Sequence, residues 1–223
     1  MLKIPPQKVS FDLNGVPLAI TAWGEVSTVG SGVIRLSLIA DVNDLEVNIT
    51  PLLRAQLNRS ERCGERLSVE SASLAPARPA ANLTVNVHYE RWGCAKVLGK
   101  EVVKRLAGGN GIVVTRLIPS AGPSGIVLNG EVEKIDADGS LGELLRTGSL
   151  GTSIREKIGR SIESAIRRVG NFDSLLPPAV ASMVQVREIE FMEGQEGRLW
   201  LDLHGEASIT PEQFRVLASQ LRR

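Results

Sequence analysis

Apolar and polar residues alternate in the same interrupted pattern at two distant places along the chain. In residues 67–74 and again in residues 184–191, apolar side chains recur at steps of two, three and two positions. Alternation predicts a half-buried strand, and the step of three predicts a one-residue bulge at the same point of both copies. A short turn and a second alternating run follow each copy, so the pattern predicts two antiparallel hairpins. The apolar positions of the second runs are Leu83, Val85, Val87 and Tyr89 in the first copy, and Leu199, Leu201 and Leu203 in the second.

The remainder of the first half predicts two strands and two helices around its hairpin. The strands cover residues 9–26, with a break at Asn14-Gly15, and 33–45; the helices cover residues 50–60 and 95–106. Thr50 and Pro51 suit the N-cap and the first position of the first helix. Gly108-Gly109 suits the end of the second helix.

The second half predicts the same kinds of element in the same order. Its strands cover residues 112–118 and 126–132, and its helices cover residues 150–169 and 211–221 on either side of the second hairpin. Thr210 and Gln213 have the spacing of a capping box at the start of the last helix. The middle helix is the main difference, because it is short in the first half and about five turns long in the second.

The order strand, strand, helix, strand, strand, helix therefore occurs twice. We expect residues 1–109 and 110–223 to be two ββαββα repeats within one continuous structure. Short connections between strands favour antiparallel pairing. The predicted fold class is α+β, with long antiparallel curved sheets packed on a long amphipathic helix and an internal ββαββα duplication.

Composition narrows the possible partners. Hydrophobic residues make up 43% of the 223-residue chain, which is typical of a globular protein, while aromatic residues make up only 4%. The formal net charge of +1 provides no global field for binding nucleic acid. No apolar run approaches the roughly 20 residues that a membrane-spanning helix needs. Peripheral membrane contact stays open, and the sequence does not determine the oligomeric state.

The two cysteines, Cys63 and Cys94, lie at similar distances before and after the turn of the first hairpin. Such positions are opposite each other in an antiparallel pair, within reach of disulfide geometry. The alternative is a pair of buried free thiols in a cytosolic protein. A disulfide would indicate export, most simply to a bacterial periplasm or cell envelope, with a leader that this sequence does not contain.

The predicted long helix carries an apolar stripe that could line a binding cavity. The stripe is typical of an amphipathic helix packed on an apolar surface, and ordinary sheet packing is the simpler interpretation. A long helix facing curved, bulged strands could instead enclose an apolar groove suited to acyl chains, because each buried CH₂ contributes about 0.8 kcal/mol without directional contacts. The candidate ligand-binding residues are Ile154, Ile158, Ile162, Ile166, Val184, Val186, Leu199, Leu201 and Leu203.

Catalytic and metal-binding patterns are missing from the sequence. His88 and His204 occupy equivalent positions of the two hairpins, but no further ligands lie at metal-binding spacing beside them. A G-x-S-x-G nucleophile motif is also missing. We therefore expect a protein that is not an enzyme and needs no cofactor or metal.

The segment from residue 139, through residues 150–169 to residue 207, resembles the tubular lipid-binding superfamily, which includes bactericidal permeability-increasing-like domains and bacterial relatives. The similarity is one of pattern and covers a little under a third of the chain. It implies a hydrophobic tube that carries lipids without chemistry. The leading hypothesis is thus a protein that binds a lipid or another elongated apolar molecule between helix and sheet. The alternative is a structural or interaction protein of the bacterial envelope with a filled core.

Overall fold

The computed structural model describes the chain except for residues 31, 61, 99, 123–124, 138–182 and 221–223. The described strands are β1 (Leu2–Leu13), β2 (Val16–Thr28), β3 (Val33–Asp41), β4 (Arg59–Ser60), β5 (Gly64–Ala77), β6 (Ala80–Val97), β7 (Lys100–Gly122), β8 (Gly125–Ala137), β9 (Gln185–Glu193) and β10 (Leu199–Ser208). The described helices are α1 (Asn43–Leu57), α5 (Pro211–Gln220) and the single 3₁₀ turn η2 (Gln195–Gly197).

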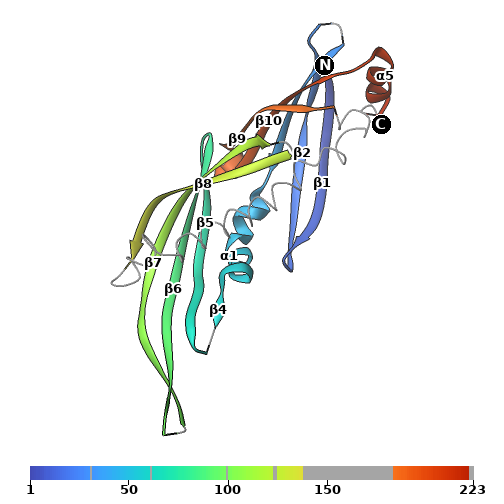
Figure 1. Ribbon diagram of the computed structural model, residues 1–223. Helices are drawn as coiled ribbons and strands as arrows, with labels where there is room; N and C mark the ends of the chain where they lie inside the picture. Colours follow the sequence, from blue (N-terminus) through green and yellow to red (C-terminus); the bar gives the residue numbers. More distant parts are fainter. Residues whose placement is uncertain (31, 61, 99, 123–124, 138–182, 221–223) are drawn as a thin grey trace.

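The strands form two five-stranded antiparallel sheets. Sheet A has the order β1-β2-β3-β10-β9, and sheet B has the order β4-β5-β6-β7-β8. The molecule is elongated, with sheet B and its long β6–β7 hairpin towards one end and sheet A with α5 towards the other (Figure 1). Sheet A combines strands from both ends of the chain, because β10 pairs with β3 along nine residues.

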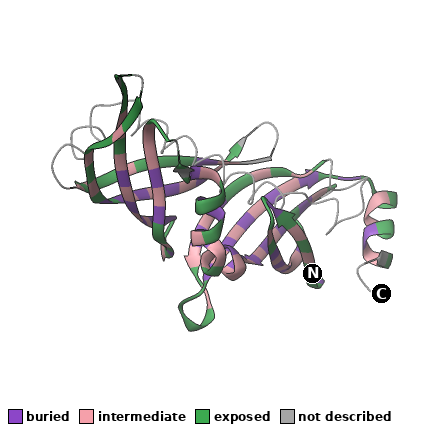
Figure 2. Cartoon of the chain, turned by 90° about the horizontal axis from the view of Figure 1, so that it is seen from below, coloured by how far each residue is buried: buried purple, intermediate pink, exposed green. Residues whose placement is uncertain are grey.

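Helix α1 connects the two sheets. It packs mainly on β5 of sheet B and also contacts β2 and β10 of sheet A. Its buried side chains are Leu45, Ile49, Leu52, Leu53 and Leu57, at the i, i+4 and i+3 spacings of an amphipathic helix. They join one hydrophobic cluster with the inward residues of both sheets. Figure 2 shows this alternation as buried bands that cross the strands of both sheets.

Polar residues of α1 also complete the hydrogen bonding of β5 where that strand bulges. The register of the β5–β6 pairing shifts between Val69 and Ser71. Backbone N–H and C=O groups of β5 near this shift bond to the helix. Thr50 Oγ1 donates to the Ala72 carbonyl and accepts from the Ala72 amide, each at 2.9 Å. Arg54 donates to the Val69 carbonyl at 2.8 Å. Because Thr50 and Arg54 are four residues apart, one helix face covers the edge of β5 beyond its short pairing with β4.

The predicted bulges are confirmed in both hairpins. In the second hairpin the register shifts between His204 and Gly205, where Glu188 and then Val186 of β9 are the partners. One residue is therefore extra on the first strand of each hairpin, at Glu70 and at Arg187. The capping box is confirmed too, since Thr210 and Gln213 bond reciprocally at 2.8 and 3.2 Å.

The predicted fold class is wrong. The described residues are 72% strand and 16% helical, with only short helices, rather than long sheets packed on a long helix. Residues 95–106, predicted as a helix, form the outer ends of β6 and β7, with Ala95 opposite Val102. The segment has helix-forming Lys, Glu and Leu residues, but cross-strand pairing on either side of the turn at Leu98 overrides that local preference. Gly108 and Gly109 lie within β7 and end no helix.

Two further boundaries differ from the predictions. The run over residues 9–26 is two paired strands, β1 and β2, joined at Asn14-Gly15, where both residues have positive φ. Helix α1 begins at Asn43, so Pro51 lies inside it and Thr50 is not its N-cap. The predicted helix over 150–169 lies outside the described residues. The division into repeats 1–109 and 110–223 stays a prediction.

Candidate functional site

The nine predicted ligand-binding residues fall into three groups. Ile154, Ile158, Ile162 and Ile166 lie outside the described residues. Leu199, Leu201 and Leu203 point from β10 into the core and are 0%, 1% and 4% exposed. Val184 and Val186 are half-buried and pack against the same cluster. The structure thus brings the β9–β10 residues together in the hydrophobic core, and their role in binding stays a prediction.

A more extended apolar surface lies on the inward side of sheet B. We call it the inner strip, and it comprises Leu83, Val85, Val87 and Tyr89 of β6, Val113, Thr115 and Leu117 of β7, and Leu128 of β8; each is at most 6% exposed. The register places Val85 beside Val113 and Leu83 beside Thr115, so the rows are continuous across the strands. From Leu83 to Tyr89 the strip extends about 20 Å at the usual rise of ~3.3 Å per residue.

Thr115 is the one buried polar residue among the described residues, at 2% exposure. Within the described part of the chain, its hydroxyl has no hydrogen-bond partner. The side chain lies in the middle of the inner strip, and its methyl group would be 3.4 Å from a Cβ atom placed on Gly130 of β8. An unpaired buried hydroxyl costs about 1–3 kcal/mol, so this position would gain from a partner that the described residues do not supply.

Tyr89 ends the inner strip with a polar group that is satisfied. Its side chain is fully buried, and the hydroxyl donates to Glu65 at 3.3 Å. Burial, and secondarily the negative charge of Glu65, raises the pKa of the Tyr89 hydroxyl. The phenol therefore stays neutral and is a hydrogen-bond donor rather than a nucleophile at neutral pH.

The outward side of sheet A carries a different kind of surface. A cleft of about 610 Å³ is lined by Pro6, Thr21, Trp23, Asp41, Gln195, Glu196, Arg198 and Trp200. The Trp23 and Trp200 rings meet edge to face with centroids 5.1 Å apart. Gly194 lies directly under the Trp200 ring, where a Cβ atom would come within 2.2 Å of it. The two tryptophan rings are thus packed against neighbours and are not two open, parallel rings between which a flat ligand stacks.

Histidine and cysteine positions offer no catalytic or metal-binding arrangement within the described part of the chain. His88 contacts Asn110 at 2.6 Å, and His204 lies 3.4 Å from Asp202, both on outward faces. Among the described residues, one group of three possible ligands occurs, and it consists of Cys63, Cys94 and Glu101. Both of its sulfur atoms belong to a disulfide and cannot act as thiolate ligands.

The predicted disulfide between Cys63 and Cys94 is confirmed, with Cα atoms 5.6 Å apart. A structural disulfide indicates an exported protein, since reducing compartments disfavour it. Among the described helices, none has the length and apolar character needed to cross a membrane.

Sequence reasoning missed Thr115 and most of the inner strip as a site. It predicted strands over 112–118 and 126–132 but assigned no role to their inward residues. The available signal was the alternation Val113, Thr115, Leu117, in which a hydroxyl replaces one apolar side chain. That alternation places Thr115 on the buried face, but only the register shows that no partner stands opposite its hydroxyl.

Comparison with known proteins leaves the family open. No family model matches the sequence, and no curated protein matches it. Among solved structures, the chain is similar to a crystal structure of lipopolysaccharide binding protein, with 9% sequence identity and a TM-score of 0.27. The alignment covers 93% of this chain and 43% of that chain, so this chain spans less than half of that protein's length. A likeness of this size does not establish a shared fold.

Proposed function

We propose that the protein binds a lipid or another elongated apolar molecule along the inner strip of sheet B. One observation carries this proposal: seven apolar side chains from three adjacent long strands form a continuous buried face with a single unpaired hydroxyl at its centre. The resemblance of the sequence pattern to the tubular lipid-binding superfamily supports the same class of ligand.

The chemistry of the inner strip suits an acyl chain. Its residues offer dispersion contacts and no charge, and burial of each ligand CH₂ contributes about 0.8 kcal/mol. Ten such groups would supply about 8 kcal/mol before the costs of immobilising the ligand and displacing core contacts. An elongated molecule matches this surface better than a compact polar one, because the strip follows the strands.

Thr115 supplies the polar recognition that an apolar surface lacks. A hydroxyl can donate one hydrogen bond and accept two. An ester carbonyl, a hydroxyl or a carboxyl group of a lipid would complete the bonding that the described residues leave open at Thr115 Oγ1. The ligand would then be oriented along the strip by one directional contact.

The protein acts as a binding protein and not as an enzyme in this proposal. The family that the sequence resembles has no catalytic residues, and the Cys63–Cys94 disulfide supports export. We propose the bacterial periplasm or cell envelope as its location, with peripheral membrane contact during exchange of the ligand.

The competing function is a structural or interaction module of the envelope with a filled core. One observation favours it: Leu83, Val85, Val87 and Leu117 are 0% exposed, so the strip has no free surface in this conformation. A carrier must therefore displace core contacts when it takes up its ligand, whereas a structural module never does.

Lipid extraction and native mass spectrometry of the purified protein test the proposal. A carrier should retain a bound lipid or take up a fluorescent fatty acid in saturable fashion. Protein that is free of lipid and does not take up the probe would favour the structural module.

Replacing Thr115 by Val tests the site itself. Because the unpaired hydroxyl is removed, T115V should raise the free energy of unfolding of the ligand-free protein by about 1 kcal/mol. It should also weaken fatty-acid binding by about tenfold, the value of one hydrogen bond to a charged group. The matched control is T84V on the outward side of β6, which should leave binding unchanged. Equal affinity of T115V and the wild type would remove Thr115 from the site.

A further inference from the structure

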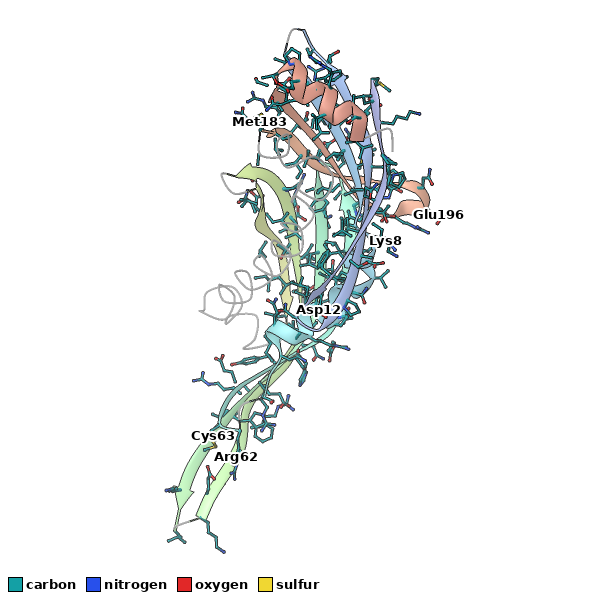
Figure 3. All side chains as sticks on the ribbon, turned by 90° about the vertical axis from the view of Figure 1, so that its right-hand side faces the viewer. Lys8, Asp12, Arg62, Cys63, Met183 and Glu196 are labelled. Carbon is teal, nitrogen blue, oxygen red and sulfur yellow. A yellow bond between two sulfur atoms is a disulfide. The ribbon has the colours of Figure 1, made fainter. Side chains whose placement is uncertain are left out.

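The outer part of the β6–β7 hairpin stands apart from the rest of the molecule. Residues 93–97 of β6 pair with residues 100–104 of β7 and with no other described strand. Strand β5 begins at Gly64, opposite Trp92, so its support stops there. Figure 3 shows the hairpin projecting beyond Cys63, and Figure 1 shows it at the end of the molecule opposite to α5 and the N-terminus.

One face of this projecting hairpin carries exposed apolar residues. Leu98 at the turn is 99% exposed, Val102 48% and Leu106 62%. The register places Ala95 opposite Val102 and Gly93 opposite Lys104, so these side chains share one side. Leu106 lies across Gly93, where a Cβ atom would come within 2.8 Å of its Cδ1. We call this side the tip face, defined by Leu98, Lys100, Val102, Lys104 and Leu106.

Unpaired positive charge surrounds the exposed apolar residues. Lys100 and Lys104 on the same side, and Lys96 on the opposite side of the hairpin, are exposed, and within the described part of the chain no carboxylate forms an ion pair with them. The nearby acidic groups already have partners: Glu101 pairs with Arg62 at 3.1 Å, and Glu90 with Arg105 at 3.4 Å. The hairpin end therefore presents leucine and valine side chains within a basic rim.

We propose that the tip face docks on the surface of a lipid bilayer that contains anionic headgroups. Leucine and valine side chains at this position can enter the boundary between headgroups and acyl chains. Lysines beside them can extend their amino groups to the anionic headgroups while their methylene stems stay in the apolar layer. A second copy of the chain fits less well, because a symmetric contact would bring two lysine rims together.

The tip face lies on the same side of the sheet as the inner strip. Alternate residues of β6, from Val87 and Tyr89 through the exposed Arg91 and then Gly93 to Ala95, share one face, and Arg91 lies between the inner strip and the tip face. This shared side deepens the proposed function and rests on it: a docked hairpin would bring the bilayer to the same side of sheet B as the apolar face that takes up the lipid. Docking itself does not depend on that function.

Vesicle flotation tests the docking surface. The full chain is mixed with vesicles of phosphatidylcholine, with or without phosphatidylglycerol, and the bound fraction is measured. The wild type should bind the anionic vesicles and release them at high salt. L98E should weaken binding about tenfold or more, because one leucine leaves the interface. The double variant K100E/K104E should weaken it by at least about 25-fold, at about fivefold for each lysine.

Matched controls place equivalent changes far from the hairpin. V47E introduces the same charge at an exposed valine of α1, and K3E/K8E reverses two exposed lysines of β1; both should bind as the wild type does. Figure 3 shows Lys8 on the body of the molecule, away from the projecting hairpin. Equal losses in the control variants, or equal binding to neutral vesicles, would overturn the proposal. A dimer in sedimentation velocity that L98E dissociates would also overturn it, in favour of a second copy.

Uptake of a fluorescent fatty acid from solution separates the two proposals. L98E should lose vesicle binding and keep fatty-acid uptake. If wild-type protein takes up the fatty acid but ignores anionic vesicles, the docking proposal is wrong and the carrier function stands. If it binds vesicles through the tip face but takes up no fatty acid, the carrier function is wrong and the docking surface stands.

Discussion

The inner part of the β6–β7 hairpin lies next to β5 and β8, and the outer part projects beyond them. The two parts share one alternating pattern of side chains but lie in opposite environments. In the inner part, Val85 and Val87 are fully buried, while in the outer part Val102 and Leu106 are about half exposed or more. The inner part has β5 and β8 as neighbours and lies over the common core, and the outer part has neither. Alternation therefore determines which residues share a face, and the neighbouring strands determine whether that face is buried.

This contrast indicates different roles for apolar residues of the same type. A valine in the inner part contributes to the free energy of unfolding, because folding removes it from water. Val102 in the outer part keeps about half of its surface in water in the isolated molecule, so it gains less from folding. Its remaining exposed apolar surface can contribute only when a partner covers it.

The largest expected effect is the difference in the free energy of unfolding between V87E and V102E. A glutamate in the fully buried position 87 has no partner for its charge and should lower the free energy of unfolding by about 4 kcal/mol or more. The same change at the exposed position 102 should alter it by about 0.5 kcal/mol or less. Urea unfolding followed by circular dichroism measures both. Comparable destabilisation by the two variants would show that the outer part is packed in solution.

The disulfide should have the next largest effect, because it lies at the junction of the two parts. Cys63 and Cys94 are separated by 31 residues. Replacing both with serine should lower the free energy of unfolding by about 3 kcal/mol, chiefly because the unfolded chain without the cross-link gains conformational entropy. Thermal unfolding without reductant measures this loss, and adding reductant to the wild type should reproduce it. A wild-type melting curve that does not change with reductant would contradict a stabilising role.

The smallest expected effect is a pH dependence at the same junction. The indole N–H of Trp92 donates to Glu90 at 2.8 Å and is the main cause of the lowered pKa of the Glu90 carboxyl; partial burial opposes it, and His88 and Arg105 add to it. A lowered folded-state pKa means that the stabilisation is present above the unfolded-state value and disappears as the pH falls through the folded-state value.

E90Q should therefore narrow the difference in stability between neutral and acidic conditions. Unfolding by urea at pH values on both sides of about 4, the ordinary range of glutamate, measures this difference. The control E101Q changes a carboxyl of the outer part. A pH profile of E90Q that is identical to that of the wild type would show that the Trp92 contact does not persist in solution.

Local chemistry made several features predictable from the residues alone. The step of three at residues 67–74 and 184–191 predicted both bulges, since a strand must gain one residue to keep its apolar side chains on one face. The spacing of the two cysteines about the first turn predicted their bond. Thr210 and Gln213 predicted the start of α5, because a capping box needs only neighbouring residues.

Features that depend on distant partners were missed. Residues 95–106 have the composition of a surface helix, and their pairing in a hairpin is a cross-strand effect that no local window contains. Thr50 was identified as a special residue of its helix, but its partner is the backbone of Ala72 rather than the helix end. The ligand-binding residues predicted on the helix over 150–169 lie outside the described residues. The candidate site, the inner strip, lies on β6, β7 and β8.

The sequence by itself determined the bulges of the two repeated hairpins, the cap of the last helix and the pairing of the cysteines. Each of these depends on residues that are close in the chain or symmetric about one turn. Only the tertiary structure decided that β10 joins β3, that α1 packs over β5 beside its bulge, that Thr115 is buried with no partner among the described residues, and that Leu98 projects into solvent. Burial and hydrogen-bond satisfaction depend on what lies across the sheet, and that information is held by the packed chain as a whole.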